Sequence, residues 1–295
     1  FGSRECGFKF SFRSSVPSTP SPVRECASMV HILCYGDSLT AGFCSGGRQF
    51  EPYSRTLEST LVEAGSDNPR VIECGLSGLT AEEMVADLDS GMIVDVCRMR
   101  RQGLRWLMAE HGVPDLVIIM AGTNDFAYQR DMSVILQDII TLHEACHEFG
   151  AKTIAMAPPS TDRSARKALS LRLKAWAKRT PDVIAFVDPE VNIVPRHRCE
   201  CWEPDNVHLS PYGYQCLGRE LAMIVLAKYD ENAEEQGGAL DLIKEFSGRL
   251  GRKKANVEHA MYALSGRMQR KDGKGMSAKL RNHATGLLRK VRRDD

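Results

Sequence analysis

Short apolar runs rich in valine and isoleucine alternate along the chain with longer segments whose apolar residues recur at helical spacing. Apolar runs of this kind are typical of strands that are buried on both faces of a sheet. The expected strands are 30–35, 71–74, 116–121, 153–157 and 183–187. The expected helices are 53–64, 80–110 in two pieces broken near Gly91, 132–149, 164–179 and 211–228.

This strict alternation of strand and helix predicts the fold class. Each connection between strands is long enough to hold a helix, as a crossover between parallel strands requires. In the segment 132–149, for example, Ile135, Ile139, Leu142 and Cys146 recur on one helical face. We therefore expect residues 29–230 to form one α/β domain with a five-stranded, doubly wound parallel sheet.

The two ends of the chain differ from this alternating middle. Residues 1–28 hold seven serines and three prolines with only two acidic residues, so we expect a disordered arm, with an organelle-targeting leader as the alternative. Residues 231–295 open with an acidic linker (ENAEEQGG) and continue with basic segments that have few apolar positions. We expect these residues to form a basic helical appendage.

The net charge of +1 conceals an uneven distribution. Residues 249–293 carry fourteen Lys and Arg against two acidic residues, which leaves 25 Lys and Arg against 36 Asp and Glu elsewhere. An acidic body with a basic tail is the result. The tail is suited to weak contact with a polyanion or an anionic membrane surface, to docking on the chain's own body, or to simple exposure to solvent. Nothing in the sequence indicates the oligomeric state.

Composition excludes several classes of protein. With 43% hydrophobic and 26% charged residues, the chain is neither disordered throughout nor fibrous. Its longest uninterrupted apolar run, Leu221–Ala227, has seven residues, far fewer than the roughly 20 of a transmembrane helix. The ten cysteines are scattered, and several lie inside the apolar runs. This distribution favours reduced thiols and an intracellular, cytoplasmic location.

Four polar segments, three of them containing glycine, follow expected strands. They are 36–39 (GDSL), 75–78 (GLSG), 122–125 (GTND) and 205–211 (DNVHLSP). The carboxyl ends of parallel strands meet at one edge of a sheet, which is where ligands bind in such folds. We expect Ser210 to be the N-cap and Pro211 the first residue of the helix that follows the fourth segment.

The residue types in these segments fit nucleophilic catalysis on an ester. A serine hydroxyl needs a base to remove its proton, and imidazole, with a reference pKa of about 6.5, suits that role near neutral pH. Ser38 therefore needs His208, and Asp205 can select the tautomer whose Nε2 faces the serine. The backbone N–H groups of Ser38 and Gly78 and the side-chain amide of Asn124 are the expected donors to the oxyanion.

The four segments, in this order, resemble the blocks of the SGNH, or GDSL, hydrolase family, which contribute Ser, Gly, Asn and His. The resemblance spans residues 29 to about 230 and assigns the five residues named above to the family's catalytic positions. It also implies a flavodoxin-like three-layer sandwich. Where the family often has Asn five residues before the glycine of the second block, this chain has Glu73.

The resemblance implies hydrolysis of a carboxylic ester through an acyl-serine intermediate, with no metal or organic cofactor. The substrate classes that it implies are small acetyl or aryl esters, lysophospholipids, thioesters and acetylated sugars, to be selected by the loops 43–53, 126–131, 159–164 and 189–204. Acyl transfer to an alcohol would use the same residues. A second hypothesis, from another class, is a catalytically idle binding module that the basic tail recruits to nucleic acid or anionic membrane.

Other polar residues carry weaker hypotheses. The segment 143–147 (HEACH) matches the H-E-x-x-H motif of zinc proteases, but no third ligand is evident in the sequence, and the same helix also carries a core face. The cluster of His197, Cys199 and Cys201 could bind zinc, although C-x-C is not the usual spacing. For Asp37 and Asp125 we expect a bracing role, in which the carboxylate accepts hydrogen bonds from backbone N–H groups.

Overall fold

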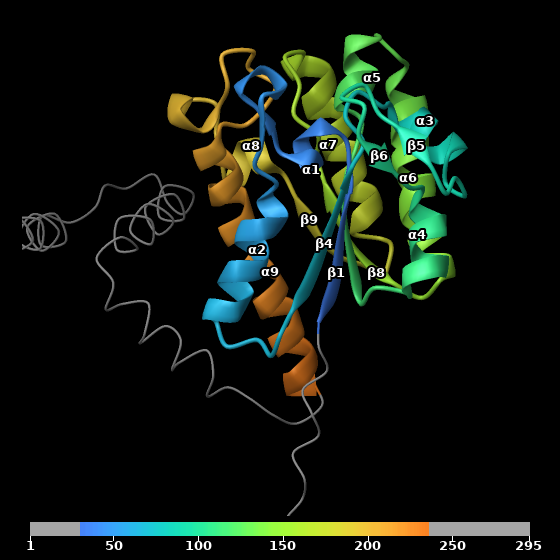
Figure 1. The fold of residues 1–295 in the computed structure, drawn as a ribbon, viewed down its shortest axis with the longest axis vertical. Coiled ribbons are helices and arrows are strands. Elements are labelled where there is room, and N and C mark those ends of the chain that lie inside the picture. Colours follow the sequence, from blue (N-terminus) through green and yellow to red (C-terminus); the bar gives the residue numbers. More distant parts are fainter. Residues whose placement is uncertain (1–29, 236–295) are drawn as a thin grey trace, which may run out of the picture. The chain divides into compact units, whose positions relative to one another are not determined.

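The computed structural model describes residues 30–235, with side chains up to Tyr229. Its centre is a five-stranded parallel sheet with the strand order β4-β1-β7-β8-β9 (Figure 1). The strands are β1 (His31–Gly36), β4 (Arg70–Gly75), β7 (Leu116–Met120), β8 (Lys152–Met156) and β9 (Val183–Val187). In chain order along the sheet this is 2-1-3-4-5, the flavodoxin-like arrangement. The expected fold class is confirmed.

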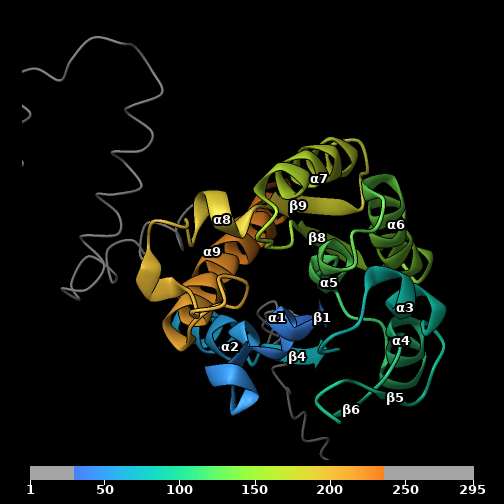
Figure 2. The ribbon, with the colours of Figure 1, turned by 90° about the horizontal axis from the view of Figure 1, so that it is seen from above.

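Helices cover both faces of the sheet, as Figure 2 shows. One face carries α3 (Ala81–Ala86), α4 (Leu104–His111), α6 (Met132–Glu148) and α7 (Arg163–Ala177), and the other carries α2 (Tyr53–Glu63) and α9 (Pro211–Glu235). Alternate residues of a strand point to opposite faces, and in the inner strands β1, β7 and β8 both sets are buried. In β7, all five residues are buried. Burial on both faces is why these inner strands occur in the sequence as continuous apolar runs.

The remaining elements are short, and several follow a strand at its carboxyl end. They are α1 (Ser38–Ala41), β2 (Phe43–Cys44), η1 (Ser45–Gly47), β3 (Gln49–Phe50), β5 (Ile93–Val94), β6 (Arg100–Arg101), α5 (Thr123–Ala127), α8 (Pro189–Asn192) and η2 (Cys199–Cys201). Each has five residues or fewer, too few to show a helical or strand period in the sequence.

The expected pair of helices over 80–110 is wrong in its middle. Helix α3 ends at Ala86 and α4 begins only at Leu104, and between them β5 and β6 form a small antiparallel hairpin. β-Branched residues such as Ile93 and Val94 favour an extended backbone, which explains the difference. Gly103 precedes α4 where the chain passes the end of α3, and a Cβ there would lie 2.0 Å from the Asp87 carbonyl oxygen.

The last helix begins where the sequence predicts but ends later. The Gly213 N–H donates to the Ser210 hydroxyl at 3.1 Å, so Ser210 caps a helix whose first residue is Pro211. Helix α9 then continues to Glu235, past the expected end at Lys228. The first residues of the predicted acidic linker are therefore helical. The predicted arm 1–28 and the rest of the appendage lie outside the described residues.

Residue contacts divide the chain after Leu226, within α9, and the described residues of the second unit are the final turns of that helix. Within residues 30–235, no helix combines the length and the apolar character that crossing a membrane requires. The eight cysteines in this part of the chain are free thiols, six of them buried.

Candidate active site

The strand order places three of the four polar segments side by side. Strand β1 lies between β4 and β7, so the segments that follow these strands are neighbours. Backbone hydrogen bonds join them, because Leu76 N donates to the Gly36 carbonyl at 2.7 Å and Asp37 N donates to the Met120 carbonyl at 3.4 Å. These three segments therefore lie together at the carboxyl ends of the strands, where the sequence predicts the site.

Ser38 is the first residue of α1, directly after β1, and only 5% of its surface is exposed. Asp37 caps this helix, and its Oδ1 accepts a hydrogen bond from Leu39 N at 2.9 Å. Burial raises the pKa of Asp37 to about 6, against the lowering influence of the Leu39 N–H and of His208. Asp37 thus has the bracing role expected from the sequence, and it fixes the turn that carries the serine.

His208 contacts this serine although it lies 170 residues later in the chain. Its Nε2 lies 2.9 Å from the Ser38 hydroxyl oxygen, and its Nδ1 lies 2.7 Å from Oδ2 of Asp205. In the tautomer that donates from Nδ1 to the carboxylate, Nε2 has a free lone pair for the serine proton. The three residues form one hydrogen-bonded series.

Asp205 is itself held by the turn that it belongs to. Its Oδ1 accepts from Val207 N at 2.9 Å and from His208 N at 3.0 Å. Partial burial would raise the pKa of this carboxyl, but the hydrogen bonds from the His208 ring and from these two N–H groups outweigh it and lower the pKa. The carboxylate is therefore ionised at neutral pH, which its 46% exposed side chain also favours.

The aromatic ring of Phe43 packs against His208, a contact that the sequence did not predict. The Phe43 ring lies 4.5 Å from the His208 ring, centroid to centroid, at an angle of 38°. Tyr214 on α9 donates from its hydroxyl to the Phe43 carbonyl at 3.0 Å, which ties this residue to the helix that follows the histidine. No local pattern could have paired Phe43 with a residue so distant in the chain.

Asn124, near the start of α5, contacts the residue directly after the second polar segment. Its Nδ2 donates to the Leu79 carbonyl at 2.8 Å, and an amide nitrogen carries a second hydrogen for another acceptor. The neighbouring Asp125 accepts from Ala81 N at 2.9 Å and pairs with Arg130 at 2.7 Å. Asp125 therefore has the expected bracing role, and both residues join α5 to the part of the chain just after Gly78.

Gly78 occupies a position where only glycine fits well. Its φ is +84°, and a Cβ there would lie 2.6 Å from both γ-carbons of Val96. A left-handed backbone and a neighbouring side chain therefore both favour glycine at this position. The preceding peptide is held by the β5–β6 hairpin, since Ser77 N donates to Asp95 Oδ2 at 3.1 Å and Val96 N donates to the Ser77 carbonyl at 3.2 Å.

Glu73, which departs from the family's usual residue, lies at the base of the same loop. Its Oε1 accepts from Gly75 N at 2.6 Å, and its Oε2 lies 3.4 Å from Nη2 of Arg101. Arg101 also donates from Nε to the Gly75 carbonyl at 3.1 Å. Burial raises the pKa of Glu73, and Arg101 opposes that rise. An acid–arginine pair therefore supplies the hydrogen bonds to the end of β4.

A cavity of about 510 Å³ lies beside Asp205. It is lined by Ser45, Gly46, Arg48, Glu203, Pro204 and Asp205. These residues come from two parts of the chain, the segment after α1 and the turn before α9. The cavity therefore lies at or next to two of the loops expected to select the substrate, 43–53 and 189–204.

The H-E-x-x-H segment has a packing role in the structure. His143 Nδ1 and His147 Nε2 lie 2.9 and 3.0 Å from the same hydroxyl, that of Thr153 on β8. Burial, with a smaller effect of His147, lowers the pKa of His143 to about 3, so His143 is neutral. Of the second candidate cluster, Cys199 is exposed and Cys201 buried. Across residues 30–235, no three His, Cys, Asp or Glu side chains are grouped to hold a metal ion.

Solved structures resemble this fold over most of their own length. A carbohydrate acetylesterase family member from Sinorhizobium meliloti is 23% identical with a TM-score of 0.51, covering 68% of this chain and 99% of that chain. The psychrotrophic esterase EstA from Pseudoalteromonas sp. is 19% identical with a TM-score of 0.50, covering 70% and 99%. A carbohydrate esterase family 3 protein from Talaromyces cellulolyticus is 18% identical with a TM-score of 0.50, covering 68% and 99%. At these identities the likeness shows the fold.

Sequence comparison with protein families is more specific. None of the curated proteins compared matches the chain. Residues 34–216, which include Ser38, Gly78, Asn124, Asp205 and His208, match the family described as GDSL-like lipase/acylhydrolase. Because this match covers more than half of the sequence, the chain belongs to the GDSL-like lipase/acylhydrolase family of hydrolases.

Proposed function

We propose that the chain hydrolyses carboxylic esters through an acyl-serine intermediate, with Ser38, His208 and Asp205 as its catalytic triad. The observation that carries the proposal is the series of hydrogen bonds from Asp205 through both nitrogens of His208 to the Ser38 hydroxyl. Membership of an acylhydrolase family and the fold shared with proteins named as esterases support it.

In the proposed first half-reaction, Ser38 Oγ attacks the ester carbonyl carbon while His208 Nε2 takes the hydroxyl proton. Asp205 stabilises the imidazolium that forms and keeps the ring oriented. The intermediate then breaks its bond to the alcohol oxygen, which receives the proton from His208. In the second half-reaction, water attacks the acyl carbon while His208 Nε2 takes a proton from it. The bond from the acyl carbon to Ser38 Oγ then breaks, Oγ receives the proton from His208, and the carboxylic acid leaves.

The proposed oxyanion site uses the N–H groups of Ser38 and Gly78 and the Nδ2 of Asn124. Each donor directed at the developing charge is worth about 3 kcal/mol in the transition state. Neighbouring strands carry these three groups, and the contacts of Asp37, Asp95 and Leu79 fix the loops on which they lie. Such preorganisation is what electrostatic stabilisation requires.

A phosphonate probe tests the nucleophile. The Pseudoalteromonas esterase was crystallised inhibited by monoethylphosphonate, and we expect a fluorophosphonate to label this chain on Ser38. Ser38→Ala should abolish both labelling and ester turnover. Ser59→Ala is the matched control, because Ser59 lies on α2 and its hydroxyl donates to the Thr56 carbonyl. Labelling of the Ser38→Ala variant would refute the assignment.

A panel of esters then narrows the substrate, which we propose to be a small molecule. It contains p-nitrophenyl esters of increasing acyl length, an acetylated sugar, a lysophospholipid and an acyl thioester. Added alcohols would divert the acyl group if the chain also transfers it. If neither labelling nor turnover occurs with any of them, the idle binding module is the better hypothesis. Salt-sensitive binding of a polyanion that is lost on deletion of residues 249–293 would then assign the function to the tail.

A further inference from the structure

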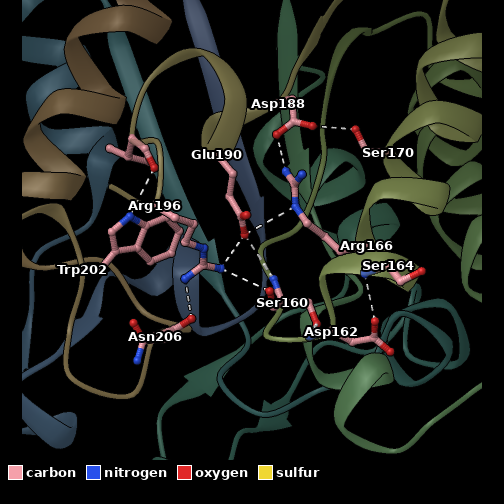
Figure 3. A network of polar contacts seen from close by, with 11 residues as sticks. Ser160, Asp162, Ser164, Arg166, Ser170, Asp188, Glu190, Arg196, Trp202 and Asn206 are labelled. Carbon is pink, nitrogen blue, oxygen red and sulfur yellow. Dashed lines mark hydrogen bonds and ion pairs between the residues drawn. The ribbon is translucent and has the colours of Figure 1, made fainter. Parts of the chain in front are cut away.

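Arg196 lies between α8 and η2, and its guanidinium group contacts three separate segments (Figure 3). Its Nη1 donates to the Asn206 carbonyl at 2.5 Å. Its Nη2 donates to the Ser160 carbonyl at 3.2 Å and to Oε1 of Glu190 at 2.5 Å. The guanidinium carbon also lies 3.6 Å from the centre of the Trp202 ring. This side chain therefore joins the loop after β8, the helix after β9 and the turn before α9.

The contact with Asn206 leads directly to the candidate site. The Asn206 carbonyl and the Val207 N–H belong to one peptide group. The carbonyl accepts from Arg196, and the N–H donates to Oδ1 of Asp205. Asn206 has a φ of +56°, the left-handed conformation of a tight turn. The peptide is thus held at both ends, and its orientation determines where the Asp205 carboxylate lies.

A continuous series of hydrogen bonds follows from this arrangement. It runs from Arg196 through the 206–207 peptide to Asp205, from Asp205 to His208, and from His208 to Ser38. Bonds that share a peptide group polarise one another, so a cation at one end strengthens the bond at the other. An arginine can do this while keeping its second nitrogen on another partner, because its donors form a rigid fork.

Arg196 is itself anchored on the far side. Glu190, whose side chain is 8% exposed, accepts from Arg196 and from Ser160 N at 3.3 Å, and lies 3.4 Å from Nε of Arg166. Arg166 pairs in turn with Asp188, which accepts from the Ser170 hydroxyl at 2.6 Å (Figure 3). The Trp202 ring that stacks on Arg196 is fixed by its own bond from Nε1 to the Val194 carbonyl at 3.2 Å. Arg196 therefore fixes an exposed turn to side chains that are themselves buried.

We propose that Arg196 is a positioning residue for ester hydrolysis, acting through the 206–207 peptide on Asp205 and His208. This inference rests on the proposed function. Removing Arg196 leaves the three catalytic side chains present but lets the turn that carries two of them move. A displacement of about 1 Å in a catalytic group can cost about 100-fold in rate.

The test compares Arg196→Ala, Arg196→Lys and the control Arg198→Ala, on a p-nitrophenyl ester that the wild type turns over. Arg198 lies on the same segment, but its guanidinium contacts Glu200 and Tyr212. We expect kcat to fall about 100-fold in Arg196→Ala with KM within about twofold, because substrate binding is not what the arginine serves. The kcat of Arg196→Lys should lie between those of the wild type and Arg196→Ala, because lysine keeps the positive charge but lacks the paired N–H donors of the guanidinium group. Arg198→Ala should retain wild-type kcat.

Chemical rescue separates positioning from a general loss of structure. Guanidinium ion, added below the concentration that unfolds the protein, should restore part of the kcat of Arg196→Ala and leave that of Arg198→Ala unchanged. Should Arg196→Ala fail to fold, Arg196→Lys supplies the same comparison of kcat with KM. Wild-type kcat in both Arg196→Ala and Arg196→Lys would overturn the inference, and so would equal losses of kcat in Arg196→Ala and Arg198→Ala. Either result would leave the proposed function in place. A wild type without turnover or labelling would remove the proposed function, and this inference with it.

Discussion

The Nε2 atom of His208 lies 2.9 Å from the hydroxyl oxygen of Ser38, although 170 residues separate the two in the chain. Each is held by its own local structure: Ser38 by the short helix after β1, and His208 by the turn that closes with the bond from Glu203 N to its carbonyl. Neither residue alone has a specific meaning, because loop serines and surface histidines are common. Their contact, together with the Asp205 carboxylate on the other nitrogen of His208, is what points to catalysis.

Asp205→Asn tests that carboxylate. The amide can still accept a hydrogen bond, but it no longer favours the required tautomer or stabilises the imidazolium, so kcat should fall by about 10³- to 10⁴-fold. The measurement is steady-state turnover of the ester that the wild type prefers. Glu200→Gln is the control, because this acid lies five residues earlier and pairs with Arg198. Nearly unchanged kcat in Asp205→Asn would mean that the carboxylate only shapes its turn.

Asn124→Ala tests the side-chain donor to the oxyanion. Loss of one such donor typically costs about 10²- to 10³-fold in kcat with little change in KM. The substitution also removes the bond to the Leu79 carbonyl, so the free energy of unfolding should fall by about 1 kcal/mol. Kinetics and urea denaturation on the same samples measure both effects. A loss of stability without a loss of kcat would assign Asn124 to loop structure alone.

Asp95→Asn tests whether the β5–β6 hairpin positions Gly78. The buried Asp95 carboxylate accepts from Ser77 N at 3.1 Å and from Met99 N at 2.8 Å. An amide offers only one oxygen to these two donors, so one N–H group loses its acceptor. The free energy of unfolding should fall by about 1 to 3 kcal/mol, and kcat should fall about tenfold as the Gly78 N–H loses its fixed direction.

Asp89→Asn is the control for this prediction. Asp89 lies on the same connection, but it is exposed and forms a surface pair with Arg105. Its loss should cost less than about 1 kcal/mol, as exposed pairs usually do, and should leave kcat unchanged. Equal effects of the two substitutions would show that the hairpin has no special relation to the glycine loop.

The parts of this fold that the sequence predicts are those with a local cause. The three inner strands β1, β7 and β8 are buried on both faces, and all five strands are short apolar runs whose positions are visible in the sequence. The four polar segments could be identified because each follows such a run. Ser210 and Pro211 could be recognised as a helix start because capping depends on adjacent residues.

The parts that the sequence does not predict depend on contacts between distant segments. Phe43 packs on His208, and Arg196 reaches the Asn206 carbonyl, without any repeated pattern near either residue. The hairpin over 93–101 has strands of two residues, which is too short for a period to appear. Contacts with other segments hold it, among them the Asp95 carboxylate, which accepts from Ser77 N and Met99 N, and the pair of Arg101 with Glu73.

His143 makes a prediction about stability at acid pH. Its ring is fully buried, bonded to Thr153 and packed 5.1 Å from the Trp176 ring, and burial lowers its pKa to about 3 from an unfolded value of about 6.5. Between about pH 6.5 and pH 3, His143 therefore binds a proton in the unfolded chain but stays neutral in the folded chain. The contribution to stability is complete above about pH 6.5 and is lost progressively as the pH falls toward 3. At about pH 5 the loss should be about 2 kcal/mol.

His143→Gln should reduce this dependence, because glutamine can still bond to Thr153 but does not titrate. Urea denaturation at about pH 7 and about pH 5 measures the difference in the free energy of unfolding. The variant should be less stable than the wild type at the higher pH, through lost packing, and should lose about 2 kcal/mol less on acidification. His111→Gln, at an exposed position on α4, should leave the wild-type dependence intact. His147, whose pKa burial also lowers, adds a smaller loss in the same direction in all three proteins. If acidification destabilises His143→Gln as much as the wild type, the buried ring is not the group responsible.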